Sequence, residues 1–191
     1  MSIKVESILF VGVGGDGIIT VSNIVAEAFM LADYDVKKSE IHGMSQRGGS
    51  VSASVRFGDR VYSPTDKKAG VGFVIATEKV EFLRWVGYYR KNAVCVVNDR
   101  LVPIINKELD EGFIDKAIED LKIEKLIKRR FLDDALKIGN PRVANTIMLG
   151  VISRFLPVDV STIKEAIERV VPGKVLEINL RAFEHGLNIQ L

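Results

Sequence analysis

The densest group of chemically useful side chains lies between residues 40 and 50. This stretch surrounds three glycines, which permit unusual backbone angles, with carboxylate, imidazole, hydroxyl, amide and guanidinium groups. Gly48-Gly49 followed by Ser50 could form a nest of backbone amides for an anion, and Arg47 could hold a phosphate or carboxylate through two hydrogen bonds. We therefore predict that the stretch contacts a ligand or partner, the alternative being a polar loop that satisfies neighbouring backbone groups. Its sequence is Glu40, Ile41, His42, Gly43, Met44, Ser45, Gln46, Arg47, Gly48, Gly49, Ser50.

A second glycine-rich segment has the spacing Gly-x-Gly-x-x-Gly and reads Gly12, Val13, Gly14, Gly15, Asp16, Gly17. Between a strand and a helix, such a loop offers backbone amides and a helix dipole to a phosphate. A dinucleotide site would also need an acid at the end of the second strand, where Glu40 is the nearest candidate. Asp16 weakens the phosphate interpretation, because its carboxylate can cap the helix itself and would repel a pyrophosphate. Phosphate binding and simple tight packing of helix on strand both remain open.

The remaining side chains offer little redox or metal chemistry. Cys95 is the only cysteine and lies in an apolar run, so it predicts a buried thiol with no internal disulfide and no iron-sulfur cluster. The two histidines, His42 and His185, have no regular spacing to acids, which argues against catalytic zinc, and His185 fits the end of a helix. We expect no catalytic residue, no metal ligand and no cofactor held by this chain alone.

Composition narrows the class of protein. The 191 residues are 47% hydrophobic, which predicts one domain over residues 1–191 with a core that needs no disulfide or metal. The formal charge of +2 argues against nucleic acid or anionic lipid as a partner, and the basic run at 122–130 fits a solvated helix face. No apolar stretch reaches the roughly 20 residues needed to cross a membrane. Together with a single reduced cysteine, these features predict a soluble cytoplasmic protein.

The elements that must position the two glycine-rich segments can be predicted from hydrophobic patterning. An apolar run at 7–13 predicts a buried strand, and the spacing that follows predicts a mostly buried helix over about 17–31. Residues 36–41 then fit a second strand, joined to the first by a right-handed crossover as its parallel neighbour. The first unit is therefore a Rossmann-like βαβ motif.

The rest of the chain extends this sheet. Alternation at 50–62, with Gly58-Asp59 as a tight turn, predicts a β-hairpin insertion. We expect strands at 71–77 and 93–97, helices at 78–90, 142–155 and 161–170, the last of these capped near Ser161, and a final helix ending near Gly186. Residues 113–127 have helical spacing but could conceal a short strand. The predicted fold is a three-layer α/β/α domain with a mostly parallel sheet.

These motifs together resemble the gamma-type subunits of 2-oxoacid:ferredoxin oxidoreductases, and most closely those of the indolepyruvate enzymes. The resemblance spans nearly the whole chain and is most specific in the string from His42 to Gly49. One departure is Asp16, where the family usually has glutamine. The other matching segments are 12–17, 63–64, 139–146 with 149–150, and 179–186.

The resemblance implies one subunit of a heteromeric enzyme that is inactive alone. Thiamine diphosphate, magnesium and iron-sulfur clusters would belong to a larger partner subunit, with coenzyme A as co-substrate and ferredoxin as the electron acceptor of the complex. The reaction would be oxidative decarboxylation of a 2-oxoacid to an acyl-CoA. The glycine-rich segments would line the coenzyme A region through Gly12, Gly14, Gly15, Gly17, Arg47, Gly48 and Gly49. The substrate or the partner would meet Glu40, His42, Gly43, Met44, Ser45 and Gln46.

Three alternatives remain open at this point. The oxoacid could be pyruvate or another 2-oxoacid instead of an arylpyruvate. The chain could be a free-standing nicotinamide-binding dehydrogenase that uses segment 12–17. It could also be a scaffold or assembly module that binds neither ligand.

Overall fold

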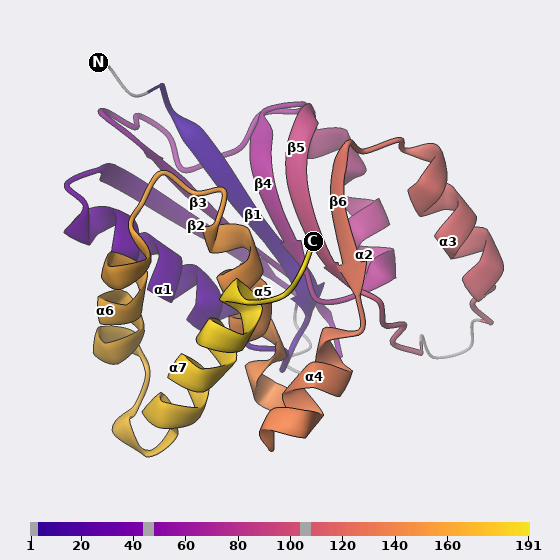
Figure 1. Cartoon of the computed structure of the whole chain (residues 1–191). Coiled ribbons are helices and arrows are strands. Elements are labelled where there is room, and N and C mark those ends of the chain that lie inside the picture. Colours follow the sequence, from indigo (N-terminus) through magenta and orange to yellow (C-terminus); the bar gives the residue numbers. More distant parts are fainter. Residues whose placement is uncertain (1–3, 44–47, 104–107) are drawn as a thin grey trace.

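A computed structural model describes residues 4–43, 48–103 and 108–191, and these residues form a six-stranded mixed sheet (Figure 1). The strand order is β2-β3-β1-β4-β5-β6. β1 runs parallel to β4, β4 to β5 and β5 to β6, whereas β3 is antiparallel to both β1 and β2. The strands are β1 (Glu6–Val13), β2 (Asp35–His42), β3 (Ser50–Gly58), β4 (Val71–Ala76), β5 (Tyr89–Asn98) and β6 (Lys125–Arg129).

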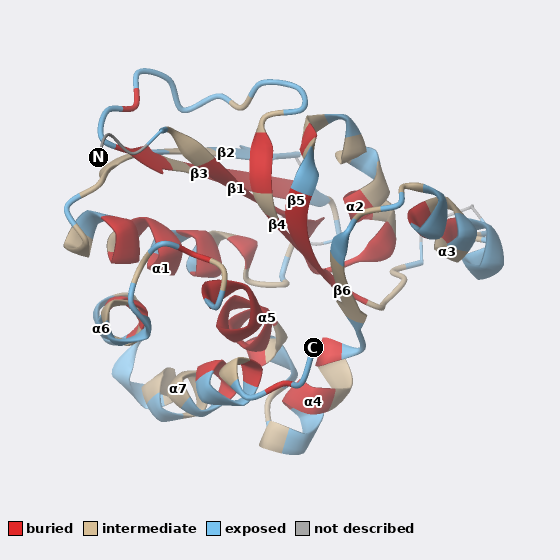
Figure 2. Cartoon of the chain, turned by 45° about the horizontal axis from the view of Figure 1, so that its top comes forward, coloured by how far each residue is buried: buried red, intermediate tan, exposed pale blue. Residues whose placement is uncertain are grey.

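Helices cover both faces of this sheet, so the predicted three-layer α/β architecture is confirmed (Figures 1 and 2). Side chains alternate across β1: Ile8 and Phe10 pack with α1 and α4–α7, and Leu9 and Val11 pack with α2 and α3. The helices are α1 (Ile18–Leu31), α2 (Lys79–Arg84), η1 (Val86–Tyr88), α3 (Glu111–Asp120), α4 (Phe131–Ile138), η2 (Pro141–Val143), α5 (Ala144–Ser153), α6 (Val160–Val170) and α7 (Gly173–Leu187).

The pairing of β2 corrects one prediction. The first strand, the helix after it and the second strand lie close to their expected bounds, but β2 is not a neighbour of β1. β3 lies between them, with Val55 opposite Ile8 on one side and Lys38 on the other. The hairpin is therefore formed by β2 and β3 around residues 43–49, and the expected hairpin within 50–62 is wrong. β3 forms eight residue pairs on each edge, which the three residues after the Gly58-Asp59 turn could not provide.

Residues 59–70, which follow β3, run over the outer face of β2 and β3, where Figure 2 shows a long exposed segment above the sheet. The Arg56 guanidinium donates to the carbonyls of Ser63 and Thr65, at 2.6 and 3.1 Å, and the Ser39 hydroxyl donates to the Pro64 carbonyl at 3.2 Å. Residues 59–70 therefore cover β2 and β3 on the face of the sheet that α2 and α3 cover elsewhere.

Three local expectations also need correction. The helix predicted at 78–90 ends at Arg84, and Tyr89 begins β5, with its hydroxyl donating to the Phe82 carbonyl at 2.6 Å. The basic run at 122–130 is not a helix face, because residues 125–129 form the edge strand β6 that the helical spacing concealed. Asp159, not Ser161, is the N-cap residue of α6, and it makes no side-chain cap bond. Within the described ranges, no helix is long and apolar enough to cross a membrane.

Candidate functional site

The first glycine-rich segment connects β1 to α1 at the carboxyl edge of the sheet. Gly15 and Gly17 have φ values of 105° and 77°, a region that favours glycine, and Gly17 is the N-cap of α1. A methyl group on Gly17 would lie 2.3 Å from Asn145 Nδ2. Gly12 has a different role, since a methyl group there would lie 1.9 Å from Thr77 Oγ1. Gly12 therefore permits close packing within the sheet, and Gly15 and Gly17 shape the loop.

The two glycine-rich segments are hydrogen-bonded to each other. The Gly14 amide donates to the Gly49 carbonyl at 2.8 Å, and the Gly48 amide donates to the Gly14 carbonyl at 3.2 Å. These bonds continue the antiparallel ladder beyond the pair Val13 and Ser50. We call this contact of residues 14, 48 and 49 the glycine junction. Two segments that the sequence singled out separately therefore form one piece of structure.

A cavity of about 410 Å³ lies beside the glycine junction. Its wall combines the first glycine-rich segment and the start of α1 with the end of the β2–β3 hairpin. His42 and Gly43 are exposed, so both can be reached by a ligand or by another chain. The lining residues are Val13, Gly14, Gly15, Gly17, Ile18, Ile19, His42, Gly43 and Val51.

Glu40 does not line this cavity. It lies on the edge strand β2 and forms an ion pair with Lys38, which also bonds to Asn23 of α1. The expected contact residues Met44, Ser45, Gln46 and Arg47 lie outside the described residues. Of the expected site, the structure therefore brings together Gly14, Gly15, Gly17, His42 and Gly43, with Gly48 and Gly49 joined through the junction.

Asp16 does not cap α1, which corrects the expectation from the sequence. Its carboxylate accepts a hydrogen bond from Thr77 Oγ1 at 2.8 Å and pairs with Arg100 Nη1 at 3.0 Å. Both partners follow parallel strands, β4 and β5, at the same edge of the sheet. Arg100 therefore balances the charge that was expected to repel a phosphate, and Asp16 ties the loop to two neighbouring strands.

Asn145 is a site residue for which the sequence reasoning gave no role. It is buried at the start of α5, and its Nδ2 donates to the carbonyls of Asp16 and Gly17, at 3.1 and 2.9 Å. The adjacent Thr146 hydroxyl lies 2.7 Å from Asn179 Oδ1, which connects the same support to α7. Two smaller cavities, of about 190 and 260 Å³, flank this asparagine. In the sequence, the feature that could have pointed to Asn145 is its place in the polar motif 139–146, directly before an apolar run.

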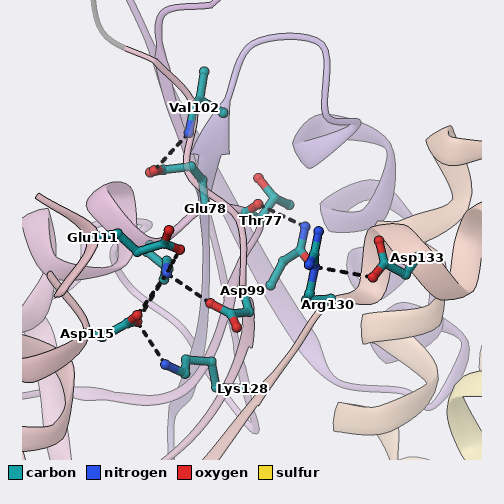
Figure 3. Close-up of polar contacts among 11 residues, drawn as sticks. Thr77, Glu78, Asp99, Val102, Glu111, Asp115, Lys128, Arg130 and Asp133 are labelled. Atoms are coloured by element: carbon teal, nitrogen blue, oxygen red, sulfur yellow. Dashed lines mark hydrogen bonds and ion pairs between the residues drawn. The ribbon is translucent and has the colours of Figure 1, made fainter. Parts of the chain in front are cut away.

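A cluster of charged groups lies at the other end of the same edge, around Lys79, whose partners Asp99, Glu111 and Asp115 are labelled in Figure 3. The fully buried Lys79 ammonium pairs with Glu111 at 2.7 Å, Asp99 at 3.0 Å and Asp115 at 3.1 Å. Burial by itself lowers the pKa of Lys79, but the hydrogen bonds to these carboxylates outweigh it and raise the pKa above its ordinary value. The three carboxylates are close enough together to hold a metal ion, but the ammonium already occupies their centre.

Glu78 and Cys95 are also buried ionisable residues, and their surroundings point to structural roles. The Glu78 carboxylate caps α2 by accepting the Glu81 amide at 2.7 Å, and its burial raises its pKa. Burial also raises the pKa of Cys95 to about 12, so the thiol stays protonated and unreactive at neutral pH. The expectation that Cys95 is a buried hydrophobic residue is confirmed.

Comparison with known proteins gives consistent matches over nearly the whole chain. The family model of pyruvate ferredoxin/flavodoxin oxidoreductase matches residues 7–189. Indolepyruvate oxidoreductase subunit IorB of Pyrococcus horikoshii is 34% identical, with 96% of this chain and 95% of that protein covered. Subunit IorB of Thermococcus kodakarensis is 35% identical with the same coverage.

Solved structures show the same fold at lower identity. The gamma subunit of a keto/oxoacid ferredoxin oxidoreductase from Geobacter sulfurreducens has a TM-score of 0.71 and 21% identity, with 95% of both chains covered. A 2-oxoglutarate:ferredoxin oxidoreductase from Magnetococcus marinus has a TM-score of 0.74 and 22% identity. The match covers 96% of this chain but 30% of that one, so the fold also occurs as part of a longer polypeptide.

Proposed function

Because the chain belongs to the pyruvate ferredoxin/flavodoxin oxidoreductase family, we propose that it is the non-cofactor subunit of an indolepyruvate-type 2-oxoacid:ferredoxin oxidoreductase. The observation that carries this proposal is the nearly full-length similarity, at 34–35% identity, to indolepyruvate oxidoreductase subunits. The complex decarboxylates an arylpyruvate, passes electrons to ferredoxin and transfers the acyl group to coenzyme A. This chain is inactive alone.

The donor groups of this chain do not fit the cofactors that such a reaction needs. An iron-sulfur cluster is held by several thiolates, whereas this chain has one cysteine, whose thiol is buried and protonated. Among the described residues, the acidic group with metal-like spacing is Asp99, Glu111 and Asp115, and Lys79 neutralises it. We therefore assign thiamine diphosphate, magnesium and the clusters to a larger partner subunit.

The part of the reaction assigned to this chain is the binding of coenzyme A and of the partner. The glycine junction, the start of α1 and the adjacent cavity of about 410 Å³ support this role, because they combine an apolar wall with backbone amides and a positive helix end. Arg47 meets an anionic group of coenzyme A. His42, Ser45 and Gln46 orient the substrate or the partner's backbone.

A free-standing nicotinamide-binding dehydrogenase has less support. In that class of protein the ribose-binding acid ends the strand next to the glycine loop. Here β3 separates β2 from β1, and Glu40 is paired with Lys38 outside the lining of the cavity. The acid and the glycine segment thus do not form the expected pair.

Reconstitution tests the proposed function. The purified chain is mixed with the larger subunit that is proposed as its partner, and reduction of ferredoxin is followed with indolepyruvate, pyruvate or 2-oxoglutarate, each with and without coenzyme A. We expect turnover only with both subunits and coenzyme A, and fastest with indolepyruvate. Turnover of any oxoacid by the isolated chain, or a mixture with no oxoacid-dependent activity, would contradict the proposal.

Replacing Arg47 tests the coenzyme A contact. In the reconstituted complex, Arg47→Ala should raise KM for coenzyme A about tenfold with little change in kcat, because a hydrogen bond to a charged group contributes roughly 1.5–3 kcal/mol. Arg181→Ala, which removes an exposed guanidinium from α7, is the control and should leave KM unchanged. Unchanged assembly and an unchanged KM in the Arg47 variant would remove this residue from the site.

A further inference from the structure

A buried carboxylate on α2 holds the segment that follows the glycine junction. Glu81 is only 6% exposed, and its Oε2 accepts a hydrogen bond from the Ser50 hydroxyl at 2.6 Å. Its other oxygen, Oε1, pairs with Arg84 Nε at 3.1 Å. Burying a carboxylate is costly unless such partners satisfy it, so the Ser50 contact accounts for part of the stability of this arrangement. Ser50 comes directly after Gly48-Gly49 in the sequence.

The contact acts on a segment that is already attached to β1. Gly48 and Gly49 are bonded to Gly14, and Ser50 pairs with Val13 at the end of the ladder. Adjacent strand residues point to opposite faces of a sheet, so the Ser50 side chain faces α2 while that of Val51 faces the cavity. Glu81 therefore fixes from one face of the sheet a segment whose other face forms the cavity wall.

We propose that Glu81 is a positioning residue for the coenzyme A region. By holding Ser50, it sets where Gly48 and Gly49 lie against Gly14 and thereby fixes the wall formed by Val51. This inference rests on the proposed function, because the positioned segment is the one assigned to coenzyme A and to the partner.

A purely helical role for Glu81 predicts something different. An acid in the first turn of α2 stabilises the helix dipole whatever lies opposite it, and that effect needs neither Ser50 nor the glycine junction. The positioning role instead requires that the effects of changing Glu81 and Ser50 depend on each other. A double-mutant cycle separates these two roles.

The first experiment measures positioning in the full-length chain without its partner. Hydrogen exchange of the Gly14 and Gly48 amides is followed by NMR in wild type, Glu81→Ala and Glu81→Gln. Loss of one hydrogen bond to a charged group should speed exchange at both amides about fivefold in Glu81→Ala. Glu81→Gln, which keeps an acceptor for Ser50, should exchange nearly as wild type does. The Tyr34 amide, bonded to the Phe29 carbonyl at the C-terminal end of α1, is the internal reference and should not change.

The second experiment measures the consequence in the reconstituted complex. Glu81→Ala should raise KM for coenzyme A about fivefold while kcat changes less than twofold, and Glu81→Gln should restore KM. Adding Ser50→Ala to Glu81→Ala should have no further effect. Arg84→Ala is the control: it removes the other partner of Glu81, leaves the Ser50 contact in place and should keep the wild-type KM.

The two experiments distinguish failure of the positioning role from failure of the proposed function. Unchanged exchange at Gly14 and Gly48 overturns the positioning role. Faster exchange with an unchanged KM in an active complex overturns its link to coenzyme A. Additive effects of Ser50→Ala and Glu81→Ala, or no rescue by Glu81→Gln, favour the helical role and overturn the proposal. If the wild-type complex shows no coenzyme A dependence, the proposed function fails, and the exchange data alone then decide whether Glu81 positions the junction.

Discussion

Two regions at the carboxyl edge of the same sheet differ in almost every property. Around Lys79, one ammonium and three carboxylates satisfy one another at 2.7–3.1 Å. At the glycine junction, the contacts are backbone hydrogen bonds, and a cavity of about 410 Å³ lies alongside. The first region has more reactive side chains. A cavity of about 320 Å³ borders its Asp99 and Glu111, but both carboxylates are already paired with Lys79, whereas the larger cavity at the glycine junction has an apolar wall.

The difference shows that reactive side chains indicate function only when their partners leave them available. Lys79 is enclosed by its own counter-charges, so it links α2, β5 and α3 and stabilises the fold. The glycines at 14, 15 and 17 have no side chains, yet they bring backbone and the start of α1 to a cavity. We therefore expect changes around Lys79 to alter stability alone, and changes at the glycine segment to alter both stability and coenzyme A binding.

The largest effect should come from Lys79→Met. Removing the ammonium leaves three carboxylates close together, with Lys128, which pairs with Asp115, as their remaining counter-charge, and this should lower the free energy of unfolding by about 3 kcal/mol. Urea denaturation measures this change. Lys137→Met is the control, because Lys137 is 77% exposed and its ion pair with Asp134 is long, at 3.9 Å. KM for coenzyme A in the complex should stay at the wild-type value. If Lys79→Met changed KM for coenzyme A and left stability unchanged, the cluster around Lys79 would be functional and not structural.

A smaller loss of stability, with a functional effect, should follow from Gly17→Ala. An alanine in the left-handed region costs about 1–2 kcal/mol, and its methyl group would displace Asn145 from the loop carbonyls. We expect urea denaturation to show that loss and the complex to show a higher KM for coenzyme A. Gly87→Ala is the control, because a methyl group there meets no atom within 4 Å. A Gly17 variant with wild-type KM would mean that the glycine segment is structural, as Lys79 is.

The smallest effect should be the contribution of Asp115 to the pH dependence of the free energy of unfolding. The hydrogen bond from Lys128, together with Lys79, lowers the pKa of Asp115 despite the opposing effect of burial. The unfolded chain therefore takes up this proton first as the pH falls, so the contribution is complete above about pH 5 and is lost below about pH 4. Since Asp115 is partly exposed, we expect less than about 1 kcal/mol.

Urea denaturation of wild type and Asp115→Asn at pH 6 and pH 3 tests this expectation. Wild type should lose more stability over the interval than the variant does, because the variant has no carboxylate to protonate at this position. Equal losses in the two proteins would mean that Asp115 contributes no pH-dependent stability, and that the cluster around Lys79 is held together by its other carboxylates.

The parts of the fold that were predicted correctly are those fixed by contiguous residues. The apolar run at 7–13 and the helical spacing at about 17–31 each have their own periodicity, and both elements lie within one residue of their expected bounds. The sequence also singled out both glycine-rich segments, because clustered glycines and polar groups are unusual between regular elements. The resemblance to the oxidoreductase family was most specific in the segment from His42 to Gly49.

The predictions that were wrong share one cause: the structure at each position depends on a residue far away in the sequence. The turn signal at Gly58-Asp59 is real, but β3 pairs with β1 and β2 and not with the residues after that turn. Likewise, Asp16 is placed where it could cap α1, yet it pairs with Arg100, 84 positions away. Local spacing contains no information about such partners.

Most of the regular elements, both glycine-rich segments and the family could be predicted from the residues alone. Tertiary structure alone decided that Gly14 bonds to Gly48 and Gly49, that Asn145 and Glu81 hold these segments, and that Lys79 is enclosed by carboxylates. The physical reason is range: propensity and periodicity act between near neighbours in the chain, whereas ladder pairing, ion pairing and burial act between groups that only the folded chain brings within a few ångströms.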